Sequence, residues 1–426
     1  MLQKEELKKQ VVLRQRKRRE VFEKLDNNSI AVFHSGYTVF MSADDTYPFV
    51  VNNNFYYLTG LDEENIILTI AKFDNQYYEN LFIDENDELL VKWVGAKYTK
   101  EEASEISGVE LKDIMYQSEF TTFMNNHLQM LRYSKGVAEN IYLDLERRDL
   151  PNYTTFALEY AKMLKEDFPS VNIKNIYQMI ITLRMVKDEL EIALMKESIE
   201  TTRLAIYNVM NHHDELKNEA IANAYYNFEL DKVDKIVSFG SIMAAGMNGT
   251  VLHYRKNNSA IATDDLLLMD VGVYTKHYAS DITRTIPTSG KFTPRQKEVY
   301  EVVLDCNKKC CLYAKAGMTW KELNDYAKNI LAQGLKKLGI IKEDAELSKY
   351  YFHSIGHSLG LDVHDPCFQP LGLKEGMVIT IEPGLYIPEE KIGIRIEDDI
   401  LITKGEAIVL SKDIVKEIDD IEKMMN

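Results

Sequence analysis

The protein has 426 residues, 45% of them hydrophobic, and a formal net charge of −16 at pH 7; the length predicts two domains of ordinary size, and the negative charge argues against nucleic acid or an anionic membrane as a main partner. No run of about 18 apolar residues occurs, so no transmembrane helix is expected, and the charged stretch from Met1 to Arg19 lacks the apolar core of a signal peptide. Four cysteines in a chain of this length do not make a disulfide framework, which favours a reducing cytoplasm.

The N-terminal part, to about Lys174, alternates between strand-like and helix-like segments, which predicts an α/β domain. It includes a nearly all-basic run at 14–19, which could bind an anionic partner but is more typical of the solvent face of a surface helix. In that helix Val21, Phe22 and Leu25 should face inward. Exposed aromatic side chains are expected at Phe55–Tyr57 and at Trp93, and strands at Ser29–Phe33, Ile66–Phe73 and Glu79–Ile83.

A domain boundary is expected within Tyr177–Arg184, and we place it between residues 178 and 179, which gives domains 1–178 and 179–426. Two pairs of helices follow, and three of the four helices begin with a capping pattern, an Asp or Thr followed three residues later by Glu or Gln. The pairs are expected at 188–210 and 215–230, and at 294–315 and 319–339. The glycine-rich stretch 238–255 between them fits neither the dinucleotide nor the phosphate-loop spacing.

The first pair of helices is followed by two aspartates in apolar runs, Asp270 and Asp281. If 266–274 and 277–286 form a hairpin around Thr275-Lys276, the two aspartates stand directly opposite each other, with Cβ atoms roughly 4.5–5.5 Å apart. Carboxylates so placed repel each other unless a positive charge lies between them.

The second pair of helices is followed by two glutamates, Glu382 and Glu397, which a hairpin centred on Pro388–Lys391 would also place opposite each other. Pro383 and Gly384 disturb this strand, so the pairing is less secure. Salt bridges to Arg284 and Arg395 are the alternative explanation, but one arginine per pair leaves excess negative charge. Because buried carboxylates are costly unless paired or bound to a cation, the two pairs suggest a shared cation.

Three histidines lie between the two halves, in the apolar and glycine-rich stretch 351–365: His353, His357 and His364. A partly buried imidazole requires a carboxylate or a metal as partner, and three of them so close together indicate a site. Packing in the core is the alternative for each histidine. A zinc site at Cys306, Cys310 and Cys311 is not favoured, because three cysteines on one helix lack the usual paired spacing.

The motifs Leu-Met-Asp-Val-Gly, Ser-Asp-Ile-Thr-Arg-Thr, His-Ser-Ile-Gly-His-Ser-Leu-Gly-Leu-Asp-Val-His-Asp, Ile-Glu-Pro-Gly-Leu-Tyr and Arg-Ile-Glu-Asp occur in this order. Together they resemble the pita-bread metallopeptidases, which include methionine aminopeptidase, aminopeptidase P and prolidase. The resemblance implies an α+β pita-bread catalytic domain after the α/β N-terminal domain. It also implies a dinuclear site with five ligands, at Asp270, Asp281, His357, Glu382 and Glu397.

The resemblance further implies two Mn²⁺ ions, and an oxygen-rich ligand set favours manganese, iron or magnesium over a thiolate-type zinc site. Asp281 and Glu397 are implied to include the bridging ligands, and Glu382 is the candidate general base because it should lie near the bridging water. The remaining roles are also implied: outer histidines that contact the substrate at His253 and His353, a pocket histidine at His364, and an arginine that orients carboxylates at Arg395.

The implied activity is that of an Xaa-Pro aminopeptidase acting on peptides with proline in second position. The segment 42–61 resembles the start of the aminopeptidase P N-terminal domain, and no long insert separates His253 from Asp270. The alternatives are an Xaa-Pro dipeptidase (prolidase) and a non-catalytic binding module. The resemblance also implies a homo-oligomer, a dimer or tetramer joined through the N-terminal domain, with Trp93 either near the substrate entrance or half-buried in the domain.

Overall fold

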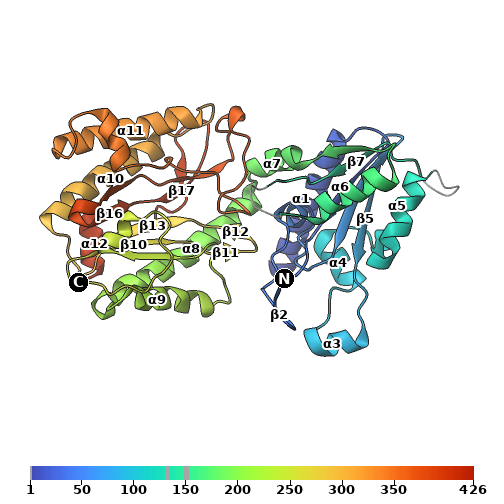
Figure 1. The fold of residues 1–426 in the computed structure, drawn as a ribbon, viewed down its shortest axis with the longest axis horizontal. Coiled ribbons are helices and arrows are strands. Elements are labelled where there is room, and N and C mark those ends of the chain that lie inside the picture. The colour runs from blue at the N-terminus through green and yellow to red at the C-terminus, as the bar shows by residue number, and fades with distance from the viewer. Residues whose placement is uncertain (1, 130–134, 148–152) are drawn as a thin grey trace. The chain divides into compact units, whose positions relative to one another are not determined.

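The computed structural model describes residues 2–129, 135–147 and 153–426, and the chain divides into two compact units, Met1–Arg184 and Met185–Asn426 (Figure 1). We call them the N-terminal unit and the C-terminal unit. The division lies within helix α7, Tyr177–Met185. Of the helices in the described part of the chain, none is long and apolar enough to span a membrane.

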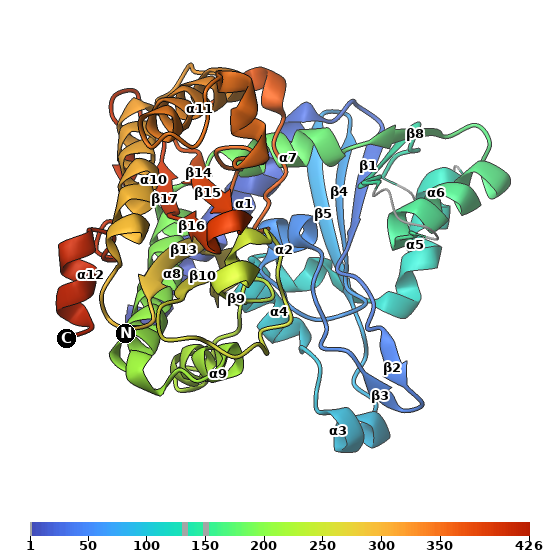
Figure 2. The ribbon, with the colours of Figure 1, turned by 60° about the vertical axis from the view of Figure 1, so that its left-hand side comes forward.

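The N-terminal unit is built on a six-stranded sheet in the order β6-β5-β4-β1-β7-β8, in which β1–β4 and β4–β5 are antiparallel and the other pairs are parallel. Helices α5 and α6 cover one face, and α1, α2 and α4 cover the other (Figure 2). The strands are β1 Ser29–His34, β4 Ile67–Phe73, β5 Gln76–Ile83, β6 Ile114–Tyr116, β7 Asn140–Leu143 and β8 Asn172–Asn175, with a separate hairpin of β2 Phe40–Ser42 and β3 Asp45–Thr46. The helices are α1 Leu2–Lys24, α2 Asn53–Thr59, α3 Glu88–Val94, α4 Lys100–Ser107, α5 Phe120–Leu128 and α6 Phe156–Asp167.

The basic run on α1 is not simply a solvent face, and this part of the sequence interpretation is wrong. Arg18 is fully buried and donates to the Glu79 carboxylate on β5 at 2.6 Å. It also donates to the carbonyl oxygens of Leu58 and Ser107, both at 2.9 Å. Arg18 shares a helix face with the buried Val21, three residues later. Lys17 is buried as well and lies over the Tyr57 ring, so the run contributes two buried cations, each with a partner.

The expectation of exposed aromatic side chains on α2 is also wrong. Phe55 is fully buried, and Tyr56 and Tyr57 are exposed by only 9% and 5%. The cause is tertiary, because α2 packs against α1, α4 and β1.

In the C-terminal unit, α8 and α9 lie along one side of the central strands and α10 and α11 along the other (Figure 1). The capping boxes predicted for α8, α10 and α11 are confirmed. The helices are α8 Glu189–Asn211, α9 Glu219–Asp231, α10 Pro294–Tyr313, α11 Trp320–Lys337 and α12 Ile418–Met424. The strands are β9 Ile242–Ala245, β10 Leu266–Val271, β11 Tyr274–Thr275, β12 Tyr278–Ala279, β13 Ile282–Pro287, β14 Val378–Ile381, β15 Gly384–Ile387, β16 Ile392–Arg395, β17 Asp398–Leu401 and β18 Ile408–Val409.

The glutamate hairpin has the predicted register, since β14–β17 and β15–β16 pair about the same centre, with Ile381 opposite Asp398 and Gly384 opposite Arg395.

The register of the aspartate hairpin differs from the predicted one by two residues. Asp270 stands opposite Thr283 instead of Asp281, because the turn is at Lys276-His277, both with positive φ. A two-residue shift preserves the strand face.

Candidate metal centre

The structure brings all nine residues singled out in the sequence to one cavity in the C-terminal unit. The cavity has a volume of about 450 Å³. Its lining includes His253, Asp270, Asp281, His353, His357, His364, Glu382, Arg395 and Glu397.

The four carboxylates reach this cavity because strands begin and end around it. Asp270 lies in β10 and Asp281 directly precedes β13, while Glu382 follows β14 and Glu397 precedes β17. The backbone N–H of Glu397 donates to the carbonyl oxygen of Thr283 on β13 at 3.0 Å. The aspartate hairpin and the glutamate hairpin are therefore joined at the site itself.

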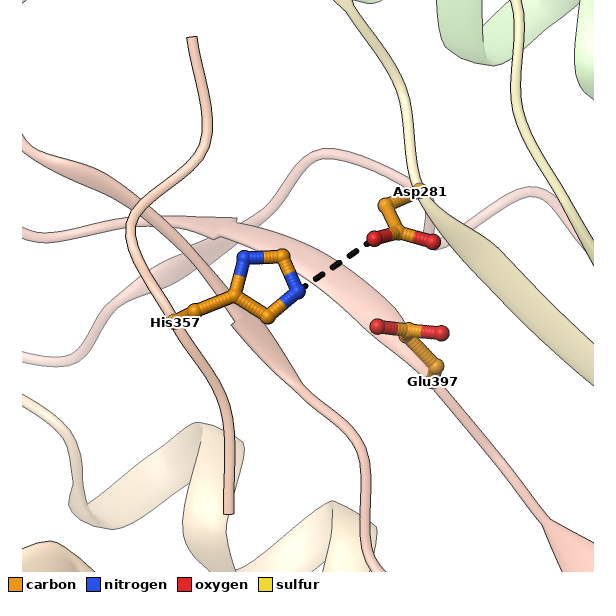
Figure 3. Close-up of side chains that lie close together, drawn as sticks. All are labelled: Asp281, His357 and Glu397. Carbon is orange, nitrogen blue, oxygen red and sulfur yellow. Dashed lines mark ion pairs between the residues drawn. The ribbon is translucent and has the colours of Figure 1, made fainter. Parts of the chain in front are cut away.

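His357 stands on the connection before β14 and points its ring toward Asp281 and Glu397 (Figure 3). Its Nδ1 lies 3.1 Å from the carbonyl oxygen of Ser358. Because a carbonyl oxygen only accepts, Nδ1 carries the proton and Nε2 is an acceptor. That acceptor faces Asp281 Oδ2 at 3.3 Å and Glu382 Oε1 at 3.7 Å, which is the arrangement of a metal-binding imidazole.

The electrostatics of the cluster favour a cation. Asp281, His357 and Glu397 each offer one ligand atom, and these atoms lie within 4.8 Å of one another. Burial, with Glu397 nearby, raises the pKa of Asp281 well above its usual range, and burial raises the pKa of Glu382 to about 8. Burial also lowers the pKa of His357 to about 3, so the imidazole stays neutral.

Two buried oxygen atoms support the same conclusion. Oδ1 of Asp270 and Oδ1 of Asp281 have no hydrogen-bond partner in the described part of the chain. Buried polar atoms are nearly always paired, so two orphaned carboxylate oxygens beside one imidazole require an explanation. Carboxylates with one neutral imidazole form a hard donor set, which suits divalent ions such as manganese, iron or magnesium.

Arg395 links the two carboxylate pairs. Its Nη2 donates to Asp270 Oδ2 at 2.6 Å and its Nε donates to the hydroxyl of Thr283 at 3.1 Å. The Thr283 hydroxyl in turn donates to Glu397 Oε2 at 2.6 Å. The guanidinium therefore fixes Asp270 directly and Glu397 through Thr283.

His353 and His364 belong to the cavity wall. Nδ1 of His353 lies 2.7 Å from the carbonyl oxygen of Ser354, so its Nε2 accepts from the Tyr386 hydroxyl at 2.9 Å. Burial lowers the pKa of His353 to about 4. The His364 ring packs on His357, with centroids 4.1 Å apart. These neutral rings can contact a substrate without adding positive charge.

Sequence reasoning missed Thr283 and Tyr386. Thr283 emerges only from the true register, in which it pairs with Asp270. Tyr386 could have been found from its spacing to Gly384. The two residues are two positions apart on one strand and so share a face, where a glycine leaves space for a large neighbouring side chain. A Cβ atom at Gly384 would lie 2.5 Å from the Tyr386 hydroxyl oxygen, so the glycine leaves room for the ring.

Both parts of the chain match known protein families. Residues 193–404 match "Metallopeptidase family M24", and residues 14–134 match "Aminopeptidase P, N-terminal domain". Xaa-Pro aminopeptidase 3 of Homo sapiens is 33% identical over 91% of this chain and 79% of its own length. The Xaa-Pro aminopeptidase of Haemophilus influenzae is 32% identical over 96% of both chains.

Solved structures match over almost the whole length. A Bacillus anthracis protein described as an aminopeptidase P is 42% identical, with a TM-score of 0.93 over 98% of both chains. Zinc-substituted E. coli aminopeptidase P in complex with product is 30% identical, with a TM-score of 0.87 over 97% of both chains. The similarity therefore extends over both units.

Proposed function

The chain belongs to metallopeptidase family M24 and carries the N-terminal domain of aminopeptidase P, and we infer that it is a metal-dependent Xaa-Pro aminopeptidase. Such a hydrolase cleaves the peptide bond between an N-terminal residue and a following proline. The observation that carries this conclusion is the neutral imidazole of His357, whose acceptor nitrogen faces a cluster of buried carboxylates.

We propose that two divalent ions, most favourably Mn²⁺, are held by Asp270, Asp281, His357, Glu382 and Glu397. When bound, such a pair lowers the pKa of a shared water and polarises the scissile carbonyl. The orphaned aspartate oxygens and the fixed His357 tautomer support this assignment. Elemental analysis of the purified protein, followed by metal removal and separate addition of Mn²⁺ and Zn²⁺, tests it.

The side chains of the cavity then have distinct tasks. Glu382 is the proposed general base, because as a ligand it should lie near the shared water when the metals are bound. His353 is held neutral and oriented by Tyr386. His253, His353 and His364 are proposed to contact the substrate, and Arg395 to orient the carboxylates. Because proline lacks an N–H, packing on its ring and fixing the scissile carbonyl must provide recognition.

The substrate is proposed to be a peptide of three or more residues. A dipeptidase must bind the proline carboxylate with a cation, and Arg395 is already engaged by Asp270. The test compares kcat/KM for an Xaa-Pro dipeptide with that for the same dipeptide extended by two residues. A tenfold preference for the dipeptide, about 1.4 kcal/mol of transition-state binding, would replace this proposal with the prolidase alternative.

The prolidase alternative depends on a second cation at the cavity. Arg255 also lines the cavity and is solvent-exposed, so it is a cation available at the rim. If Arg255 bound a proline carboxylate, Arg255→Met would reduce kcat/KM for the dipeptide much more than for the extended peptide. An equal effect on both substrates would exclude that role. Failure of the purified protein to bind metal would instead favour a non-catalytic module.

We also propose a homo-oligomer, a dimer or tetramer, that uses the N-terminal unit as its interface. The supporting surface is on α3 and the β2–β3 hairpin with the residue before it, where Trp93 is 80% exposed and the other exposed apolar residues include Val39, Phe40, Met41, Leu89, Leu90 and Val94. Trp93 is therefore not half-buried within its own unit. Light scattering at micromolar concentration tests this, and Leu90→Glu should shift the mass toward monomer.

A cytoplasmic location is proposed as well. All four cysteines are free thiols, and three of them are buried. This suits a reducing compartment. Cell fractionation with detection of the intact protein tests it.

A further inference from the structure

A buried carboxylate outside the candidate metal ligands organises one wall of the cavity. Glu219 is the first residue of α9 and is fully buried. Its Oε1 accepts from the backbone N–H of Ala245 at 2.9 Å and from the side-chain amide of Asn248 at 2.8 Å. Its Oε2 accepts from the Tyr254 hydroxyl at 2.7 Å and from the backbone N–H of Ser259 at 2.8 Å. Burying a carboxylate is costly, and these four bonds offset that cost.

All four donors belong to one segment, 245–259, which we call the clamped loop. Glu219 binds both of its ends, at Ala245 and Ser259, and its backbone N–H also donates to the carbonyl oxygen of Ser259 at 3.0 Å. The loop also touches β16, where a Cβ at Gly393 would lie 2.0 Å from the carbonyl oxygen of Gly249. Glu219 thus holds the loop in a closed shape against the strands of the site.

The clamped loop carries residues that line the cavity. Leu252, His253 and Arg255 all reach it. Tyr254, next to His253, is instead tied to Glu219 and lies 3.1 Å from the Ser259 hydroxyl. We infer that Glu219 is a positioning residue, which holds Tyr254 and the loop ends so that His253 stands in the cavity. This inference rests on the proposed function, in which His253 contacts substrate.

The chemistry at position 219 is specific for a carboxylate. Each of its two oxygens accepts from a backbone N–H, which is Ala245 on one side and Ser259 on the other. A glutamine in either amide orientation would place an NH₂ group against one of these N–H groups, and neither can accept. Glu219→Gln should therefore open the loop despite its almost identical shape. Tyr254→Phe is the milder variant, because it removes one bond and leaves the carboxylate in place.

The experiment measures two quantities in the full-length, metal-loaded protein. Hydrogen exchange of peptides covering 245–259 reports the clamp, and kcat/KM for an Xaa-Pro tripeptide reports its consequence. Tyr254→Phe should accelerate exchange in the loop and lower kcat/KM, each by about tenfold, the change that corresponds to about 1.4 kcal/mol. Tyr225→Phe is the matched control, since its hydroxyl binds Glu215 outside the loop, and it should change neither quantity.

A double-mutant cycle identifies the route. If Tyr254 acts through His253, Tyr254→Phe should have no further effect on kcat/KM in a His253→Ala background. Multiplicative losses, or unchanged exchange in Tyr254→Phe, would overturn the inference. Wild-type kcat/KM in His253→Ala would overturn it together with the proposed role of His253. Should the wild-type protein cleave no Xaa-Pro peptide, the proposed function fails, while the exchange measurement still decides whether the clamp exists.

Discussion

Removal of one partner from the buried ion pair between Lys187 and Asp365 should destabilise the C-terminal unit strongly. Lys187 Nζ lies 3.0 Å from Asp365 Oδ2, and the two side chains are exposed by only 2% and 1%. The backbone N–H of Asp365 donates to the carbonyl oxygen of Ser358 at 2.8 Å. The pair therefore fixes the turn that carries His364, one residue before Asp365. The perturbation is Lys187→Met, which keeps most of the side-chain volume.

The magnitude follows from what the variant leaves behind. Removing one member of a buried ion pair costs about 3–5 kcal/mol, because the remaining charge has lost its opposite charge in a low-dielectric interior. The surroundings of the lysine side chain are closely packed, since a Cβ atom at Gly360 would lie 2.9 Å from Lys187 Cε. Water therefore has little room to enter and solvate the remaining carboxylate in the variant. Adding Asp365→Asn should recover part of the loss, because a neutral amide is much less costly to bury than a carboxylate.

Urea unfolding of the metal-free protein measures this effect. The chain has two tryptophans, and Trp93→Phe leaves Trp320 on α11 as the single fluorescent reporter of the C-terminal unit. In that background, Lys187→Met should lower the free energy of unfolding by at least 3 kcal/mol. A loss below about 1 kcal/mol, or a double variant less stable than Lys187→Met alone, would refute the reasoning. Metal-loaded Lys187→Met should also show reduced kcat/KM, since His364 shares the turn.

Three further predictions concern charge. Burial raises the pKa of Glu382 to about 8, so the metal-free folded state binds more protons than the unfolded chain. Its stability should therefore fall as pH rises from 5 toward about 8. Thermal melts at several pH values measure this dependence, and Mn²⁺ should remove it. Asp281→Ala should abolish peptide hydrolysis without changing the circular dichroism spectrum, and wild-type turnover in a metal-loaded variant would contradict the ligand assignment. Burial lowers the pKa of His34 to about 4, so the N-terminal unit should lose stability as pH falls below about 6.5, and His34→Phe should weaken that dependence; an unchanged dependence would argue against the buried neutral imidazole.

The sequence was sufficient where a local rule determines structure. Capping boxes placed the starts of three helices, and the symmetric spacing of Glu382 and Glu397 predicted the register of their hairpin. The aspartate hairpin was shifted because its turn, Lys276-His277, adopts positive φ at both positions without the Asn or Gly that usually marks such a turn. The error was harmless for the site, because a shift of two residues leaves Asp281 on the same face.

Long-range pairing accounts for what could not be predicted. The buried position of Arg18 depends on Glu79, 61 positions away, and Lys187 meets Asp365 across 178 positions. No helical period or propensity encodes such partners. The role of Glu219 could not be predicted either, because a glutamate in the first turn of a helix is common for its favourable interaction with the helix dipole. Only the folded loop shows its second role.

The charge balance of the cavity favours the proposed pair of divalent ions over a single ion. Four carboxylates line it, and one buried guanidinium, that of Arg395, forms an ion pair with Asp270. The two half-buried histidines of the cavity add no positive charge, since the pKa values of His353 and His357 are lowered to about 4 and about 3. Ionised carboxylates would therefore exceed the buried cationic charge by three, which one divalent ion cannot balance. Arg255 at the exposed rim is screened by water. Without metal, the raised pKa values of Asp281, Glu382 and Glu397 indicate that protons supply the missing charge. Metal binding should accordingly release protons, and calorimetry in buffers of different ionisation enthalpy should show more than one proton released per site.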